Sequence, residues 1–251
     1  MDKTNQKGSL ADRLTIPALI IGAVVSAIGF ILSFTVAPLV SGAETLPEIV
    51  AGQMVSHQLL FSQKIFYFHM PVALCSFIAL FFTAFYGVRY LISKDAKYDL
   101  RTLVATEIAL VFITCTMATG VPWTHFEWGV WWSWEPRLTT YLILMLLVIA
   151  YFVLRSSLVD NEKRRTYASI FGIVAFIDAP ICFMITRLIP SSTHPVILRS
   201  DSGLSPDMLV ALLTSLMGIA LIAYGLYRLR LRQKIVSQRI AVLKNQLDEM
   251  E

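Results

Sequence analysis

Residues 65–92 read IFYFHMPVALCSFIALFFTAFYGVRYLI, an apolar run whose only Lys, Arg, Asp or Glu is Arg89. About 20 apolar residues wound as an α-helix cross the hydrocarbon layer of a membrane, which is roughly 30 Å thick. A helix also satisfies all of its backbone polar groups internally, as the interior of a bilayer requires. We therefore expect residues 65–92 to form a transmembrane helix.

Five further apolar runs bring the number of expected spans to six. Together the spans cover residues 14–40, 65–92, 103–121, 138–154, 167–189 and 206–227. Over the whole chain of 251 residues, 56% are apolar and 15% are charged, whereas about 25% are charged in an average soluble domain. We predict an all-α integral membrane protein, in which residues 1–251 form a single membrane domain built as a six-transmembrane helix bundle.

Basic residues are distributed unequally between the two sides that these spans define. Of the 21 Lys and Arg residues, 17 lie at the termini or beside the loops that follow the second and fourth spans. The positive-inside rule then places both termini, and the tail of residues 228–251, in the cytoplasm. The tail reads as a charged helix, either a solvated extension held by anionic lipid head groups or a partner-binding helix. The net charge of +4 reflects this orientation, so no nucleic-acid partner is expected.

The tryptophans are gathered in one outer loop. All five lie within twelve residues: Trp123, Trp128, Trp131, Trp132 and Trp134. An aromatic belt at the membrane interface would spread such rings over several spans. A helix over residues 129–137 would bring four side chains to one face: Trp128, Trp131, Trp132 and Glu135. We predict that this tryptophan segment, residues 123–139, lies in the interface plane and binds a large flat ligand.

The histidines fall on the same side of the membrane as the tryptophans. They are His57, His69, His125 and His194. Imidazoles bind iron, aromatic faces stack on a macrocycle and cations pair with propionates, so this set of residues has the ingredients of a haem site. The three cysteines form no CxxCH motif, and covalently attached haem is therefore not expected.

Residues 128–139, WGVWWSWEPRLT, resemble the WGxWWxWDxRLT pattern of the WWD family, the haem-handling proteins of cytochrome c maturation. Arg137-Leu138-Thr139 match its CcmC branch, haem exporter protein C, which also has six spans. Three features depart from that branch: Glu135 replaces Asp, Pro136 is typical of the related synthases, and residues 185–188 lack the usual aromatic side chains.

This resemblance implies roles for particular residues. His69 and His194 would be the two axial ligands of the haem iron, while the tryptophans at 128, 131, 132 and 134 would form a stacking platform. Arg137 would pair with a haem propionate, and Glu135 would orient Arg137 or a loop backbone. His125 lies beside the segment, but nothing in the resemblance selects it or His57.

The resemblance also implies a biological role. The chain would bind haem b non-covalently at the periplasmic face of a bacterial inner membrane and deliver it to the haem chaperone CcmE. Its partners would be the small membrane subunit CcmD and the ABC transporter subunits CcmA and CcmB. We expect no catalytic residue and no enzyme activity, because the sequence has no Walker motif and no nucleophile–base pair.

Three alternative functions differ in what they require of the sequence. A haem–thioether synthase of the CcmF and CcsA branch would need a histidine pair deep in the spans, and no histidine lies in the inner half. A haem permease would need polar stations along its path, and the span interiors offer few. A structural subunit of a respiratory complex would leave the tryptophan cluster unexplained.

Overall fold

The structure is a computed structural model, and it describes residues 10–39, 49–50, 53–54, 62–189 and 204–250. Its helices are α1 (Leu10–Arg13), α2 (Thr15–Thr35), α4 (Phe66–Ser93), α5 (Ala96–Trp128), α6 (Pro136–Ser157), α7 (Asn161–Leu188) and α8 (Pro206–Asp248). A 3-10 turn, η1 (Ser62–Ile65), precedes α4, and two short strands, β1 (Ile49–Val50) and β2 (Gln53–Met54), pair antiparallel. Six of these helices are long and apolar enough to cross a membrane, which confirms the predicted all-α, six-span fold.

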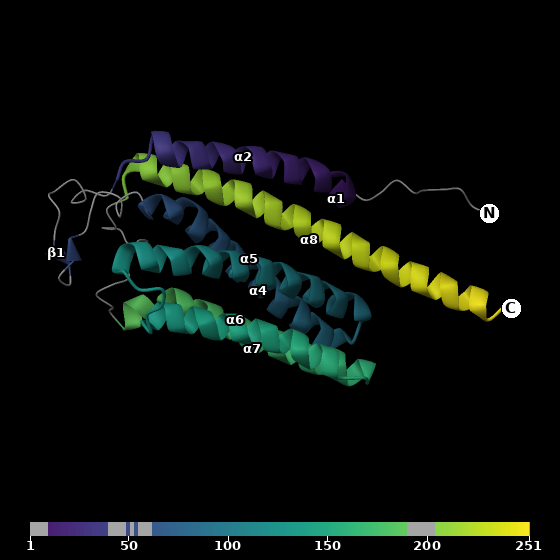
Figure 1. Cartoon of the computed structure of the whole chain (residues 1–251). Coiled ribbons are helices and arrows are strands. Elements are labelled where there is room, and N and C mark those ends of the chain that lie inside the picture. Colours follow the sequence, from purple (N-terminus) through teal and green to yellow (C-terminus); the bar gives the residue numbers. More distant parts are fainter. Residues whose placement is uncertain (1–9, 40–48, 51–52, 55–61, 190–203, 251) are drawn as a thin grey trace.

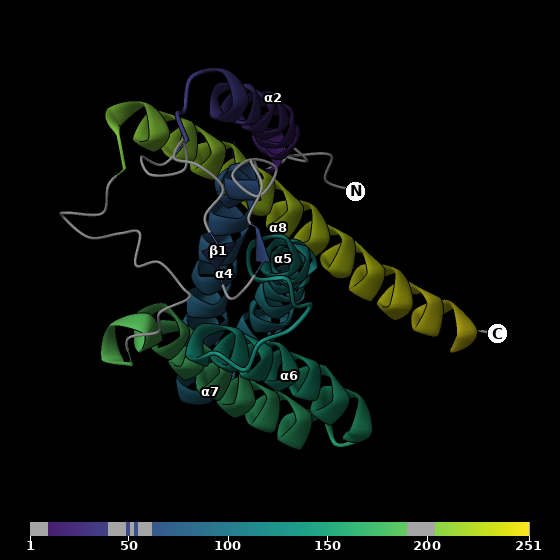
Figure 2. The same ribbon diagram turned by 60° about the vertical axis from the view of Figure 1, so that its left-hand side comes forward.

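The six long helices form three antiparallel pairs stacked in layers (Figures 1 and 2). Helices α4 and α5 make the middle layer, with α2 and α8 on one side and α6 and α7 on the other. The main core lies where α4 to α7 meet, around the fully buried side chains of Leu80, Ile113, Leu144 and Val148. The middle pair is thus covered on both sides.

Helices α2 and α8 approach each other so closely that their backbones touch. A Cβ atom added at Gly22 of α2 would lie 2.9 Å from the carbonyl oxygen of Gly218 on α8. A Cβ atom at Gly29 would lie 2.5 Å from the Ser215 hydroxyl. Small residues let helix backbones approach closely in membranes. Such packing drives helix association there, because the hydrophobic effect does not act between helices surrounded by apolar lipid.

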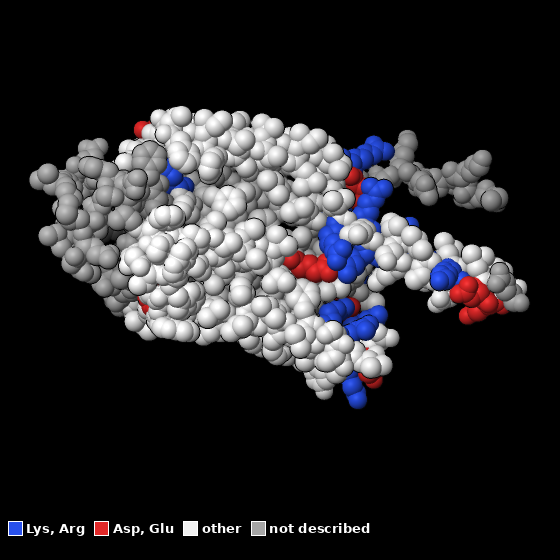
Figure 3. All heavy atoms as spheres, viewed as in Figure 1, with Lys and Arg blue, Asp and Glu red and all other residues white. Residues whose placement is uncertain are grey.

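Charged side chains gather around the end of the bundle from which α8 projects, here called the tail end (Figure 3). The Arg155 guanidinium donates to both carboxylate oxygens of the buried Asp99, at 2.6 and 2.7 Å, and Arg165 lies 3.6 Å from the same carboxylate. These contacts tie α5 to α6 and α7. Glu107 likewise joins α5 to α8, since its carboxylate accepts from Arg230 at 2.7 and 3.0 Å.

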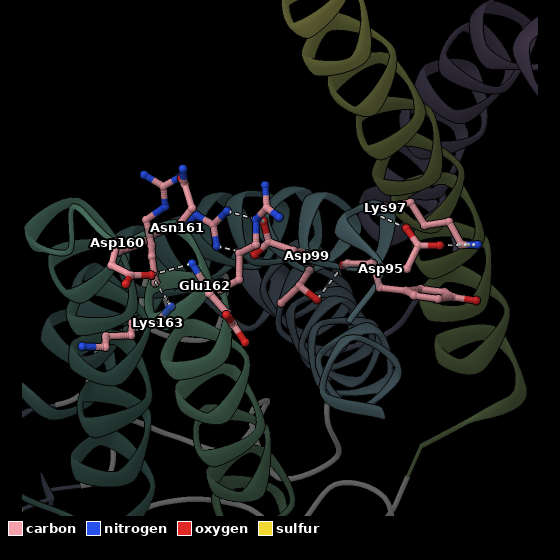
Figure 4. A network of polar contacts seen from close by, with 12 residues as sticks. Asp95, Lys97, Asp99, Asp160, Asn161, Glu162 and Lys163 are labelled. Atoms are coloured by element: carbon pink, nitrogen blue, oxygen red, sulfur yellow. Dashed lines mark hydrogen bonds and ion pairs between the residues drawn. The ribbon is translucent and has the colours of Figure 1, made fainter. Parts of the chain in front are cut away.

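Aspartates cap two of the helices that begin at the tail end, α5 and α7 (Figure 4). The Asp95 carboxylate accepts from the backbone N–H of Lys97 at the start of α5. At the start of α7, Asp160 accepts from the N–H groups of Lys163 and Glu162, and these bonds hold the pKa of its carboxyl below the ordinary value. Such caps satisfy N–H groups that have no partner within the helix.

Helices α5 and α8 extend furthest beyond the C-terminal ends of the apolar runs that indicated them. Helix α5 continues from Val121 to Trp128, and α8 continues from Tyr227 to Asp248. Both pictures of the chain show α8 running straight past the ends of its neighbours (Figures 1 and 2). No Gly or Pro interrupts residues 228–248, so the tail and the last span form one helix.

Candidate functional site

The tryptophan segment lies at the opposite end of the bundle, here called the tryptophan end, and its middle part, residues 129–135, is not helical. Helix α5 stops at Trp128 because Gly129 takes a left-handed conformation, φ 72°, and donates its N–H to the His125 carbonyl at 3.0 Å. Helix α6 starts at Pro136, and Glu135 caps it by accepting from the N–H of Leu138 at 2.9 Å. The expected helix over residues 129–137 is therefore wrong, since Gly129 ends one helix and Pro136 begins the next.

Trp131, Trp132 and Trp134 consequently lie on a loop and not on one helix face. Trp131 is 60% exposed and Trp134 is 75% exposed, while Trp128 and Trp132 are half-buried. The rings of Trp132 and Trp134 meet edge to face with centroids 5.7 Å apart. The indole N–H of Trp132 is buried without a hydrogen-bond partner in the described part of the chain. An exposed aromatic surface of this kind suits a flat ligand.

His69 lies in the first turns of α4 and is half-buried against α5. Its Nδ1 atom is 2.9 Å from the Thr119 hydroxyl, and its ring meets the indole of Trp123 edge to face, with centroids 5.5 Å apart. Sequence reasoning selected His69 but missed both of these partners. Thr119 and Trp123 are four residues apart and so share a helix face, yet this spacing alone does not reveal which residue they meet on α4.

His125 is the second histidine that the structure places at this end. Its imidazole lies parallel to the indole of Trp131, with ring centroids 4.1 Å apart. One face of the imidazole is thereby covered by a platform residue. His57 and His194, together with Arg199, lie outside the described residues. The assignment of His194 as an axial ligand therefore stays a prediction.

Two guanidinium groups from α6 and α7 lie at the tryptophan end. Arg137 is half-buried, donates to the Phe183 carbonyl at 3.4 Å, and interacts electrostatically with Glu135 and Arg187. The Arg187 guanidinium lies over the Phe183 ring, 5.1 Å from its centroid. Glu135 itself is buried and caps α6 through its bond to the Leu138 N–H. Carboxylates of a ligand would find charge-assisted hydrogen-bond donors here.

The residues at the tryptophan end fit a flat, metal-bearing ligand with carboxylate groups. Exposed indoles can stack on its face, the His69 imidazole can bind its metal, and the guanidinium groups can pair with its carboxylates. The buried indole N–H of Trp132, which has no partner among the described residues, is a further donor that such a ligand can use.

Comparison with known proteins identifies the family to which the chain is similar. The family profile described as "Heme exporter protein C" matches residues 2–246. The chain is 26% identical over 178 residues to Heme exporter protein C of Escherichia coli strain K12, which covers 70% of this chain and 71% of that protein. It is 25% identical over 184 residues to the protein of the same name from Rhodobacter capsulatus, covering 72% and 76%. A putative cytochrome c biosynthesis ccmC-like mitochondrial protein of Marchantia polymorpha is 32% identical over 118 residues, covering 47% and 49%.

Proposed function

The chain belongs to the haem exporter protein C family, and from that premise we propose that it binds haem at the extracytoplasmic face of the membrane and delivers it to the periplasmic haem chaperone CcmE. Membership gives it a role in haem handling for cytochrome c biogenesis, as a multi-pass membrane protein. The finer steps, namely the delivery to CcmE and the side of the membrane on which it occurs, are our proposal.

The observation that carries this proposal is the exposure of Trp131 and Trp134 at the bundle end that also holds His69. A macrocycle laid against exposed indoles buries apolar area on both partners. Trp132, which meets Trp134 edge to face, extends the stacking surface. An exposed platform also suits delivery, because a cargo held at a surface can pass to a second protein without crossing a core.

Haem b would be held non-covalently, through side chains that bind reversibly. His69 and His194 would supply the two axial imidazoles, and Arg137 would pair with a propionate. Arg187 is a second cation within electrostatic range of Arg137, so two guanidinium groups would be available to pair with the propionates of a bound haem. Bonds of this kind release their cargo when a partner offers a better site.

The partners and the location follow from the same role. CcmD would be the small membrane subunit, and CcmA and CcmB would supply the energy of ATP as an ABC transporter. We place the protein in a bacterial inner membrane with both termini in the cytoplasm and the tryptophan end in the periplasm, as the distribution of Lys and Arg favours. In this role the chain binds and transfers haem and is not an enzyme.

The synthase alternative rested on Pro136, which is typical of that branch. In this fold Pro136 occupies the first turn of α6. Proline is favoured there because the first N–H groups of a helix have no partner within it. Helix geometry thus accounts for Pro136 without a second haem or a thioether-forming reaction.

Purification in detergent tests the proposal. The expected result is a haem absorption spectrum, complete extraction of the haem into acidified organic solvent, and transfer of the haem to added CcmE when CcmA, CcmB, CcmD and ATP are present. Purified protein that neither retains haem nor binds added haemin would contradict it. Haem that stays with the chain after extraction would contradict non-covalent binding, and a second haem per chain would favour the synthase alternative.

A further inference from the structure

We infer that Thr119, Gly120 and Trp123 of α5 form a seat that holds the His69 imidazole with its proton on Nδ1 and its lone pair on Nε2, the atom that binds haem iron. The seat rests on the proposed function in taking His69 as an iron ligand. It adds to that function the residues that determine which of the two ring nitrogens carries the proton. Thr119 and its neighbours are positioning residues, because they act on haem through His69.

The hydrogen bonds of Thr119 decide which nitrogen carries the proton. The Thr119 hydroxyl has one proton, and two backbone carbonyls lie ready to accept it: that of Cys115 at 2.9 Å and that of Thr116 at 3.1 Å. A threonine inside a helix commonly donates to the preceding turn in this way. Its oxygen is then an acceptor toward Nδ1 of His69, which lies 2.9 Å away. A neutral imidazole that donates from Nδ1 carries its lone pair on Nε2.

Gly120 brings the ring close to the α5 backbone. A Cβ atom at this position would lie 3.0 Å from Cε1 of His69 and within 4 Å of both ring nitrogens. That separation is tighter than ordinary carbon contact. The imidazole therefore rests on the helix at a place that only glycine leaves open.

Trp123 closes the seat from the next turn of α5. The edge-to-face contact of its indole with the imidazole, at an interplanar angle of 75°, limits rotation of the ring. Residues 119, 120 and 123 share one face of the helix, so a single rigid element provides the acceptor, the close approach and the lateral contact. Outer partners of this kind fix both the tautomer and the orientation of a metal-binding histidine.

The first test needs no haem. In protein labelled with 15N-histidine, the nitrogen chemical shifts of His69, identified by their loss in His69→Gln, report which ring nitrogen is protonated. We expect the proton on Nδ1 in the parent and in Thr119→Ser, which keeps the hydroxyl, and a mixture of tautomers in Thr119→Val. Thr114→Val is the matched control, because its hydroxyl donates to the Leu110 carbonyl on the same helix.

The second test titrates the same variants with haemin. Loss of an outer partner typically lowers metal affinity about 10- to 100-fold, and we expect a loss of this size in Thr119→Val but not in Thr119→Ser or Thr114→Val. Gly120→Ala should also weaken binding, by displacing the ring. Alanine is the better helix former, so unfolding of α5 would not explain that loss.

The outcomes separate this inference from the proposed function. A parent protein with the His69 proton on Nε2 would overturn the seat, whether or not haem binds. So would Thr119→Val with parental tautomer and parental affinity, and in that case haem binding itself would stand. A parent that binds no haemin would instead contradict the proposed function, while the nitrogen shifts would still report on the Thr119 contact.

Discussion

The imidazole of His125 and the indole of Trp131 lie parallel, 4.1 Å apart between centroids and 2° apart in plane. His125 is on the last turns of α5, and Trp131 is on the loop that follows. Stacking of the two rings folds this loop back over the helix end. From this contact we propose that His125 supports Trp131 and does not bind iron.

His125→Ala should accordingly leave the haem spectrum unchanged. Removing the imidazole takes away a stacking partner of Trp131 but no bond to iron. Absorption spectra of the parent and the variant with bound haem provide the measurement. Loss of the parental spectrum in His125→Ala, with an unchanged spectrum in His194→Ala, would make His125 the second axial ligand in place of His194.

Changing Trp131 and Trp132 together to Ala should weaken haem retention, because the loss of two indoles removes most of the stacking area beside Trp134. The paired change to Phe should retain part of the affinity, since a smaller ring still stacks. Haemin titration of the purified variants measures both effects. Phe126→Ala is the control, because this ring is also exposed near the end of α5. If the Ala variant retained as much haem as the parent, the tryptophans would serve only as a membrane anchor.

Replacement of either axial ligand should alter the spin state of the iron. Two neutral imidazoles give low-spin, six-coordinate iron. His69→Ala or His194→Ala should open one axial position and shift the spectrum toward high spin, and added imidazole should restore the low-spin form. A low-spin spectrum that survives His69→Ala without added imidazole would exclude His69 as a ligand.

Labelling of single cysteines tests the orientation of the bundle. With Cys75, Cys115 and Cys182 replaced, a cysteine at Ser133 should react with a membrane-impermeant maleimide from the periplasmic side. A cysteine at Ser237, on the exposed tail of α8, should react only after the cytoplasmic face is opened. The reverse pattern would contradict both the topology and periplasmic delivery of haem.

The buried carboxylate at the tail end should matter far more for stability than an exposed one. Asp99→Asn leaves Arg155 without its ionic partner in a buried position and should lower the free energy of unfolding by about 3 kcal/mol or more. Asp95→Asn keeps a helix cap and breaks only an exposed pair with Lys97, so it should change stability little. Unfolding in detergent measures both, and equal effects would show that Asp99 is not a buried anchor.

Part of the candidate site could be predicted from the sequence. The tryptophan segment, with Arg137 and His69, was marked by residue type and spacing, because an aromatic belt would spread its tryptophans over several spans. The end of α5 was also marked locally, by Gly129 and Pro136, although the interpretation of residues 129–137 as a helix passed over both signals. That interpretation gave more weight to a common helix face for the tryptophans than to the tendency of glycine to end a helix and of proline to begin one.

The sequence by itself determined the number of spans and the uneven distribution of charge, since transfer from water to lipid depends on local composition. Only the tertiary structure decided which helices pair. Close contact between α2 and α8 depends on Gly22 meeting Gly218, and the seat of His69 depends on Thr119, 50 residues further along the chain. Hydropathy does not predict such contacts between helices, because they depend on the shapes of the helix faces that pack together.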